Sequence, residues 1–339
     1  MKILFVILTL VLSLNLAAQK HDFSIHNISL PQEISYYDNQ FSGLYIKNNN
    51  LFLMSESRLQ DSAEAKLYSI SLADLERQLA DSNYILPYTK WKIYNLNILR
   101  NKMKDRGDDY EGLEAMMIDK KRIYFSVETA TPSNNCYLLK GIINDTAIVL
   151  DTNNFFAIQK PITSDGKHIY NAGFEAIAPV NNSIAAFFEY NYFSDYNLVS
   201  YINDWSFQKG KCHKFNMDRL PFRLTDITKT KENDFTAINY FYKGDGEDEI
   251  YRLSDGDANN KLIKDTSGYK NYCRLIKIKY RNLSFSWEPL WEFPSAFSSY
   301  NWEGIAAYKK GYFVINDKYT SARPYKSVLI YLRLRNRIN

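Results

Sequence analysis

The sequence is poor in the residues that most often form catalytic nucleophiles and transition-metal sites. It contains 3 Cys and 4 His among 339 residues. Cys136, Cys212 and Cys273 offer neither metal-ligand spacing nor a disulfide framework, so we expect them to be buried packing residues. The histidines lie outside the repeated motifs described below, which leaves little support for a nucleophile activated by histidine.

Several local signatures are absent as well. The chain has no Gly-x-Ser-x-Gly elbow, no His-Glu-x-x-His helix and no glycine-rich phosphate loop ending in Lys-Ser or Lys-Thr. Glycine is scarce, at 13 residues, so turns must rely on pairs such as Asn48-Asn49 and Asn181-Asn182. The net charge of +4 is spread along the chain and gives no reason to expect nucleic acid as a partner.

The first residues predict export. Lys2 supplies a positive start, Ile3 to Leu16 form an apolar stretch, and Ala17 and Ala18 provide small residues for cleavage. We therefore expect residues 1–18 to be a signal peptide and residues 19–339 to form one exported domain, periplasmic or extracellular. No later stretch is long and apolar enough to predict a membrane span.

Aromatic residues are abundant, with 27 Tyr and 20 Phe, which favours β-structure. An internal repeat supports this prediction. Five segments begin with a hydrophobic and a polar residue, contain a central turn, and carry a second polar residue fourteen positions after the first. Such a segment predicts a β-hairpin whose two ends lie at the same edge of a sheet. The pairs are Ser42/Glu56, Glu114/Glu128, Glu175/Glu189, Thr225/Asn239 and Glu303/Asp317.

Further strands follow the hairpins, for example at Asn135–Gly141, Ala147–Asp151 and Ser327–Leu334. A hairpin followed by two outer strands is the unit of a propeller blade, so we predict an all-β, five-bladed β-propeller. The early strand at Phe23–Leu30 would complete the last blade and close the ring.

Two alternatives to this architecture stay open. A sixth blade without the motif would lie between Lys243 and Pro294, or the hairpins would belong to an irregular β-sandwich without a common axis. Helical periodicity is weak, and Leu72–Leu79 is the only short helix that we predict.

The repeated motifs resemble those of a known family. They read Ser-Gly-Leu from residue 42, Glu-Gly-Leu-Glu-Ala from 111, Gly-Phe-Glu-Ala-Ile from 173, Thr-Asp-Ile from 225 and Trp-Glu-Gly-Ile-Ala from 302. Together, from Phe41 to Leu334, they resemble the phytase-like (esterase-like) domain family. They are more distantly similar to the calcium-activated nucleotidases (apyrases), which are five-bladed propellers.

The resemblance implies a central calcium ion that one residue of each blade faces. By position, those residues are Ser42, Glu114, Glu175, Thr225 and Glu303. The chain departs from the apyrases where they handle the nucleotide. Ser55 to Arg58 replace an acidic segment, and Tyr190 to Tyr192 replace an arginine-rich one, so the resemblance does not extend to nucleotidase activity.

The residues themselves favour the same ion. Three carboxylates and two hydroxyls facing one small volume need a cation or raised pKa values. Oxygen ligands without His or Cys suit calcium better than magnesium or zinc. The second residues of the pairs would orient ligands or bind through water. They are Glu56, Glu128, Glu189, Asn239 and Asp317. The alternative is that all these side chains cap strand ends around a water-filled channel.

Two functions are consistent with a central cation site of this kind. In the first, calcium supports the hydrolysis of a small anionic phosphoester, with a channel carboxylate activating water. Cations at the same edge would contact the substrate, namely Arg58, Arg223, Lys318 and Arg323, although each also suits a solvated loop. In the second, the ion only fastens the blades, and an aromatic rim binds a glycan, a peptide or another extracellular ligand. The rim residues are Tyr190, Tyr192, Phe193, Tyr240, Tyr242 and Tyr300.

Overall fold

The computed structural model describes residues 22–36, 39–57, 65–194, 196–203, 205–207, 211–244, 246–317 and 326–335. The predicted signal peptide and three of the predicted anion contacts, Arg58, Lys318 and Arg323, lie outside these ranges. Across the described ranges, no helix has the length and apolar character needed to cross a membrane. Most of the described chain forms β-strands.

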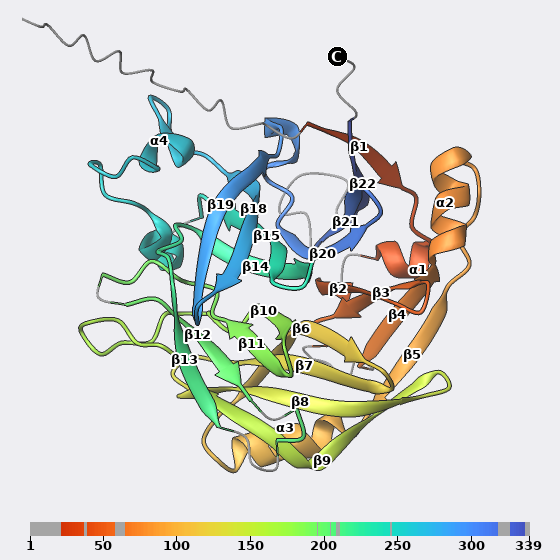
Figure 1. Cartoon of the computed structure of the whole chain (residues 1–339), viewed down its shortest axis with the longest axis horizontal. Helices are drawn as coiled ribbons and strands as arrows, with labels where there is room; N and C mark the ends of the chain where they lie inside the picture. The colour runs from red at the N-terminus through yellow and green to blue at the C-terminus, as the bar shows by residue number, and fades with distance from the viewer. Residues whose placement is uncertain are drawn as a thin grey trace, which may run out of the picture.

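The strands form antiparallel four-stranded units, each of which begins with one of the predicted hairpins (Figure 1). Unit 1 contains β2 (Phe41–Lys47), β3 (Asn50–Ser55), β4 (Lys66–Ser71) and β5 (Thr89–Tyr94). Unit 2 contains β6 (Tyr110–Asp119), β7 (Arg122–Thr129), β8 (Asn135–Asn144) and β9 (Ala147–Gln159). Unit 3 contains β10 (Ala176–Val180), β11 (Ser183–Phe187), β12 (Leu198–Ile202) and β13 (Cys212–Met217). Unit 4 contains β14 (Arg223–Lys229), β15 (Asp234–Phe241), β18 (Tyr272–Arg281) and β19 (Ser284–Glu292).

Unit 5 combines the two ends of the described chain. It contains β20 (Trp302–Tyr308), β21 (Gly311–Asn316), β22 (Leu329–Leu334) and β1 (Phe23–Ile28). β1 pairs antiparallel with β22, from Phe23 opposite Leu334 to Ile28 opposite Leu329. The predicted completion of the last unit by the early strand is therefore confirmed.

The units are also joined at their outer strands. β5 pairs in parallel with β9, and β13 pairs in parallel with β19. Units 1 and 2 thus form one eight-stranded sheet, and units 3 and 4 form another. Unit 5 remains a separate four-stranded sheet.

The first strands of the units surround a common centre (Figure 1). β2 contacts β6, β6 contacts β10, β10 contacts β14, β14 contacts β20, and β20 contacts β2. This closed ring of inner strands is the arrangement of a β-propeller, and it does not fit an irregular sandwich.

Helices are few. α2 (Leu72–Ala80) confirms the predicted helix, and the hydroxyl of its N-cap, Ser71, accepts a hydrogen bond from Asp74 N at 3.1 Å. α3 (Leu96–Lys104) was not predicted. Its buried residues Leu96, Leu99 and Met103 face β6 and β9. The remaining short elements are α1 (Gln32–Ser35), α4 (Asn260–Ile263), η2 (Gly246–Tyr251), η3 (Ser295–Phe297), β16 (Lys264–Asp265) and β17 (Gly268–Tyr269).

The cysteines follow the packing prediction in part. Cys136 and Cys273 are buried, and burial raises the pKa of the Cys136 thiol to about 12. Cys212 is exposed at the start of β13, so the prediction of a buried residue was wrong there. All three thiols are free.

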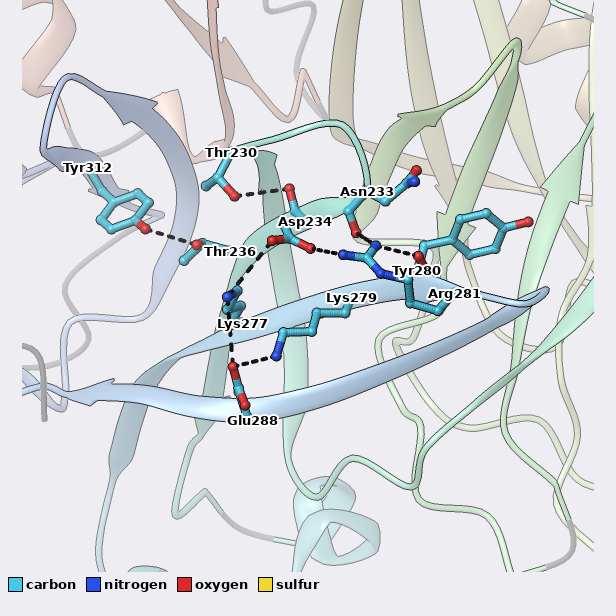
Figure 2. A network of polar contacts seen from close by, with 10 residues as sticks. All are labelled: Thr230, Asn233, Asp234, Thr236, Lys277, Lys279, Tyr280, Arg281, Glu288 and Tyr312. Atoms are coloured by element: carbon cyan, nitrogen blue, oxygen red, sulfur yellow. Dashed lines mark hydrogen bonds and ion pairs between the residues drawn. The ribbon is translucent and has the colours of Figure 1, made fainter. Parts of the chain in front are cut away.

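A polar network marks the turn end of unit 4 (Figure 2). Asp234, at the start of β15, accepts from Arg281 at 2.9 Å, and Glu288 pairs with Lys279 at 2.9 Å. Thr236 on β15 lies 3.0 Å from the hydroxyl of Tyr312 on β21, which links units 4 and 5. This network lies at the opposite end of the hairpin from Thr225 and Asn239, so it stabilises the fold away from the centre.

Candidate cation site at the centre

β-bulges direct the predicted residues toward the centre. The strand register shifts between Phe41 and Gly43, between Leu113 and Ala115, between Leu224 and Asp226, and between Trp302 and Gly304. The unpaired residue at these four places is the first polar residue of the motif: Ser42, Glu114, Thr225 and Glu303. A bulge inserts one extra residue and re-aims its side chain. The fifth residue of this set, Glu175, lies immediately before β10.

Three carboxylates meet between units 2 and 3. Glu114, Glu128 and Glu175 each place one oxygen so that the three oxygens lie within 4.8 Å of one another. All three side chains are buried. Ligands on opposite sides of one calcium ion are about 5 Å apart, so these three oxygens fit around a single ion. Glu128, which we predicted to be an outer residue, therefore lies with two of the predicted ligands.

The electrostatics of the centre favour a cation. Burial raises the pKa of Glu175 well above its ordinary value, and the negative charges of Glu114 and Glu128 raise it further. Burial also raises the pKa of Glu303, and the charge of Asp317 adds to the shift while Arg223 opposes it. The folded chain thus holds more carboxylates than it can keep ionised without a positive charge.

The two predicted hydroxyl ligands have another role in the structure. Ser42 Oγ donates to the backbone carbonyl of Leu113 at 2.6 Å, and Thr225 Oγ1 donates to that of Trp302 at 2.7 Å. Each bond joins one unit to the next, unit 1 to unit 2 and unit 4 to unit 5. These hydroxyls stabilise the ring of inner strands directly.

The second residues of the motif also connect neighbouring units. The carbonyl of Glu56 accepts from Leu113 N at 2.7 Å, and that of Glu189 accepts from Leu224 N at 3.0 Å. Asp317 is buried near the centre, and its carboxylate lies 3.4 Å from Asn301 Nδ2.

Arg223 is the one predicted anion contact within the described ranges, and it faces an internal carboxylate. Its Nη1 lies 2.9 Å from Glu189 Oε1, and its guanidinium lies 4.3 Å from the ring centroid of Tyr251. Arg223 is 20% exposed and Glu189 is 4% exposed. The pair is therefore part of the lining of the centre.

Asn239 binds two backbone carbonyl groups and does not face the carboxylate cluster. Its Nδ2 donates to the carbonyls of Pro221 at 2.8 Å and Arg223 at 3.0 Å. Its Oδ1 accepts from Arg274 Nε at 2.7 Å. Sequence reasoning missed Arg274, which is buried on β18 and resembles, in sequence, the solvent-facing cations that follow it.

Asp226 is a second residue that sequence reasoning missed. Its Oδ2 accepts from Ile305 N at 2.7 Å and from Leu44 N at 3.5 Å, and its Oδ1 accepts from Ile227 N at 2.7 Å. Burial raises the pKa of this carboxyl, and the three N–H groups oppose that shift. The available signal was the acidic residue at a motif position where the other segments carry Gly or Ala.

The inner strands approach closely beside Asp226. A Cβ atom on Gly304 would lie 3.1 Å from the backbone carbon of Gly43 and 3.0 Å from Leu44 Cγ. Glycine is therefore required where β20 meets β2.

Only some of the aromatic residues predicted to form a binding rim are exposed to solvent. Tyr190, Phe193 and Tyr240 are buried, and their rings belong to the hydrophobic packing between units. Tyr192, Tyr242 and Tyr300 keep partial exposure.

No family model and no curated protein sequence matches the chain. Among solved structures, the chain is similar to the major allergen Mala s 1 of Malassezia sympodialis, with 11% identity, 92% of this chain and 83% of that chain covered, and a TM-score of 0.49. It is similar to CoXyl43, a GH43 β-xylosidase/α-arabinofuranosidase from a compost microbial metagenome, with 6% identity, coverage of 93% and 96%, and a TM-score of 0.47. It is also similar to the N-terminal domain of Nup159, with 11% identity, coverage of 94% and 97%, and a TM-score of 0.37. The assignment of a mostly β, propeller-like fold rests on the strand topology described above, and the phytase-like resemblance stays a prediction.

Proposed function

We propose that this chain is a five-bladed, phytase-like β-propeller that binds one calcium ion at Glu114, Glu128 and Glu175. In this proposal each unit is one blade. The segment between Lys243 and Pro294 supplies β18 and β19 to the fourth blade, which argues against a sixth. The observation that carries the cation site is the approach of three buried carboxylate oxygens to within 4.8 Å of one another.

The donor set fits a hard cation. Calcium takes six to eight oxygen ligands in flexible geometry, so three carboxylates leave positions for water or for a substrate oxygen. Export, predicted from residues 1–18, would place the site in a compartment where weak calcium sites are common.

We propose further that the centre hydrolyses a small phosphoester. A bound calcium ion would polarise a phosphoryl oxygen. Glu303 is half-buried, and burial raises the pKa of its carboxyl, which makes the ionised form a stronger base toward an attacking water.

Calcium binding is tested on the mature protein after treatment with a chelator. We expect isothermal titration to give one calcium per chain, and we expect thermal unfolding to shift upward on calcium addition. A free calcium concentration one hundred times Kd adds about 2.7 kcal/mol to the free energy of unfolding. Glu114→Gln and Glu175→Gln should each abolish the shift, whereas Glu288→Gln, a change at an exposed carboxylate on β19, should preserve it. Absence of binding by the unmutated protein would reject the site.

Hydrolysis is tested by screening phosphomonoesters and phosphodiesters with and without calcium. Turnover that requires calcium and is lost in Glu303→Gln supports the enzyme. A second candidate is a non-catalytic binding propeller, and the pairing of Arg223 with Glu189 favours it, because that cation already has an internal partner. Bound calcium without turnover on any substrate would select this second function.

A further inference from the structure

Unit 4 differs from the other units at the centre. The hairpin of unit 4 is one residue longer than the others, because Asp226 pairs with Ile238 whereas Gly304 pairs with Ile315. Asn239 therefore lies opposite Leu224 as Asn316 lies opposite Trp302, and Tyr240 takes the place of the second carboxylate of the other units. Unit 4 also supplies two cations beside Asn239, Arg223 and Arg274, and Arg274 is only 3% exposed. Unit 4 therefore places two arginines around Asn239, and one of them pairs with Glu189.

The contacts of Asn239 fix the direction of its amide. Because Arg274 Nε can only donate, it must face the Asn239 oxygen, and the two hydrogens of Nδ2 then point to the carbonyls of Pro221 and Arg223. The guanidinium of Arg274 lies 4.7 Å from the ring centroid of Trp287, which holds it in place.

The two carbonyls that Asn239 binds flank a strained residue. Phe222 has a φ of 73°, in the left-handed region that bulky residues rarely adopt. Its ring is buried, packs on Phe241 at 5.6 Å and lies 5.7 Å from the guanidinium of Arg274. Such a conformation persists only where the surroundings enforce it, and here Asn239 does so from both sides.

The strained turn places Arg223 against Glu189. The ion pair at 2.9 Å neutralises a carboxylate whose charge otherwise acts on Glu175. Without Arg223, a fourth buried carboxylate would stand beside the cluster of Glu114, Glu128 and Glu175.

We propose that Asn239 and Arg274 form a positioning clamp on the Phe222 turn, which aims Arg223 at Glu189 and so keeps Glu189 out of the cation site. Asn239 and Arg274 are positioning residues, and Arg223 determines how much negative charge the cation meets. The second half of this inference rests on the proposed calcium site.

The clamp is tested in the absence of calcium by a double-mutant cycle. The midpoint of thermal unfolding is measured for each variant in the presence of a chelator. Asn239 contacts the backbone of Arg223 and not its guanidinium. If the two side chains acted independently, their effects on the midpoint of thermal unfolding would therefore add. We expect Asn239→Ala to lower the midpoint much less in an Arg223→Gln background than in the unmutated protein. Asn316→Ala removes a buried amide from the same hairpin position of unit 5, one residue before Asp317, and should be additive with Arg223→Gln. Additive behaviour of Asn239 would overturn the clamp.

The charge effect is tested by calcium titration. Arg223→Gln should bind calcium about tenfold more tightly or take up a second ion, because an added unit charge acts on a divalent cation in a partly buried site. Arg223→Lys should stay close to the unmutated affinity. The double variant Glu189→Gln/Arg223→Gln, which removes both charges, should fold and return to that affinity. Unchanged binding by Arg223→Gln would overturn the charge effect. If the unmutated protein binds no calcium, the proposed function fails, and the double-mutant cycle still decides the clamp.

Discussion

The carboxylate of Asp226 on β14 accepts a hydrogen bond from the backbone N–H of Ile305 on β20 at 2.7 Å. The same oxygen lies 3.5 Å from Leu44 N on β2. One buried side chain therefore connects inner strands of units 4, 5 and 1. We expect Asp226→Ala to lower the free energy of unfolding by about 2–4 kcal/mol, because it leaves buried N–H groups without an acceptor.

Asp226→Asn keeps one acceptor oxygen and should cost less than Asp226→Ala. Both changes are measured by urea unfolding followed by circular dichroism. An alanine variant as stable as the unmutated protein would show that the connection contributes nothing.

Gly304 should not tolerate a side chain. A Cβ at this position would lie 2.7 Å from Ile315 Cγ2 and 3.1 Å from the backbone of Gly43, so β20 and β2 would have to separate. We expect Gly304→Ala to destabilise the fold by about 1–3 kcal/mol. Gly256→Ala is the matched control, since nothing lies within 4 Å of the added atom. Equal midpoints of thermal unfolding for the two variants would contradict the close approach.

The calcium-free protein should lose stability as the pH rises. Burial raises the pKa of Glu175 and of Glu303 above the ordinary value of 4.5 in the folded chain, with neighbouring charges adding to the shift. The unfolded chain therefore releases these protons first. Their contribution to stability is complete below about pH 4.5 and is lost as the pH rises through the folded values.

We expect the midpoint of thermal unfolding in chelator to fall between pH 5 and pH 8, and calcium to remove most of that fall. Glu175→Gln should flatten the profile, because the glutamine does not ionise. A midpoint that rises with pH in chelator would contradict this account.

Glu128 should behave as a ligand, and Glu56 should not. Both occupy the second motif position, but only Glu128 contributes an oxygen to the group within 4.8 Å. We expect Glu128→Gln to weaken calcium binding at least tenfold, about 1.4 kcal/mol. Glu56→Gln should change the affinity less, and titration calorimetry of the two variants makes the comparison.

Thr225 should matter for stability and not for calcium. Its hydroxyl donates to the carbonyl of Trp302, so Thr225→Val should cost about 1 kcal/mol or more of unfolding free energy. The calcium affinity of this variant should match that of the unmutated protein. A large loss of affinity without loss of stability would return Thr225 to the ligand set.

The sequence predicted the hairpins because their signals are local. Asn48, Asn49 and Asn181 have positive φ, the conformation that tight hairpin turns favour and that asparagine tolerates. The closure by β1 was also predictable, since its strand pattern had no other partner at hand. α3 was missed because its buried face comprises only Leu96, Leu99 and Met103 within a charged run.

The site was predictable only in part. Spacing identified Glu114 and Glu175 but not the bulges that set their direction, because a bulge depends on the register between two strands. The contribution of Glu128 depends on the approach of unit 2 to unit 3, which no local pattern encodes. Arg274 and Asp226 were missed for a related reason: a charged residue is expected at the surface until a specific buried partner is known.

The pairing of β1 with β22 also has a consequence for biosynthesis. β1 and β22 lie near opposite ends of the described residues, so β1 cannot pair until nearly all of the described residues have been made. Until then the ring is open, and β1 and the unpaired edge of unit 5 are exposed to wrong partners. Contacts of such long sequence separation form slowly. The pairing of β1 with β22, which closes the ring, should therefore be the slowest step in the folding of the described residues, and it can occur only after β22 has been made.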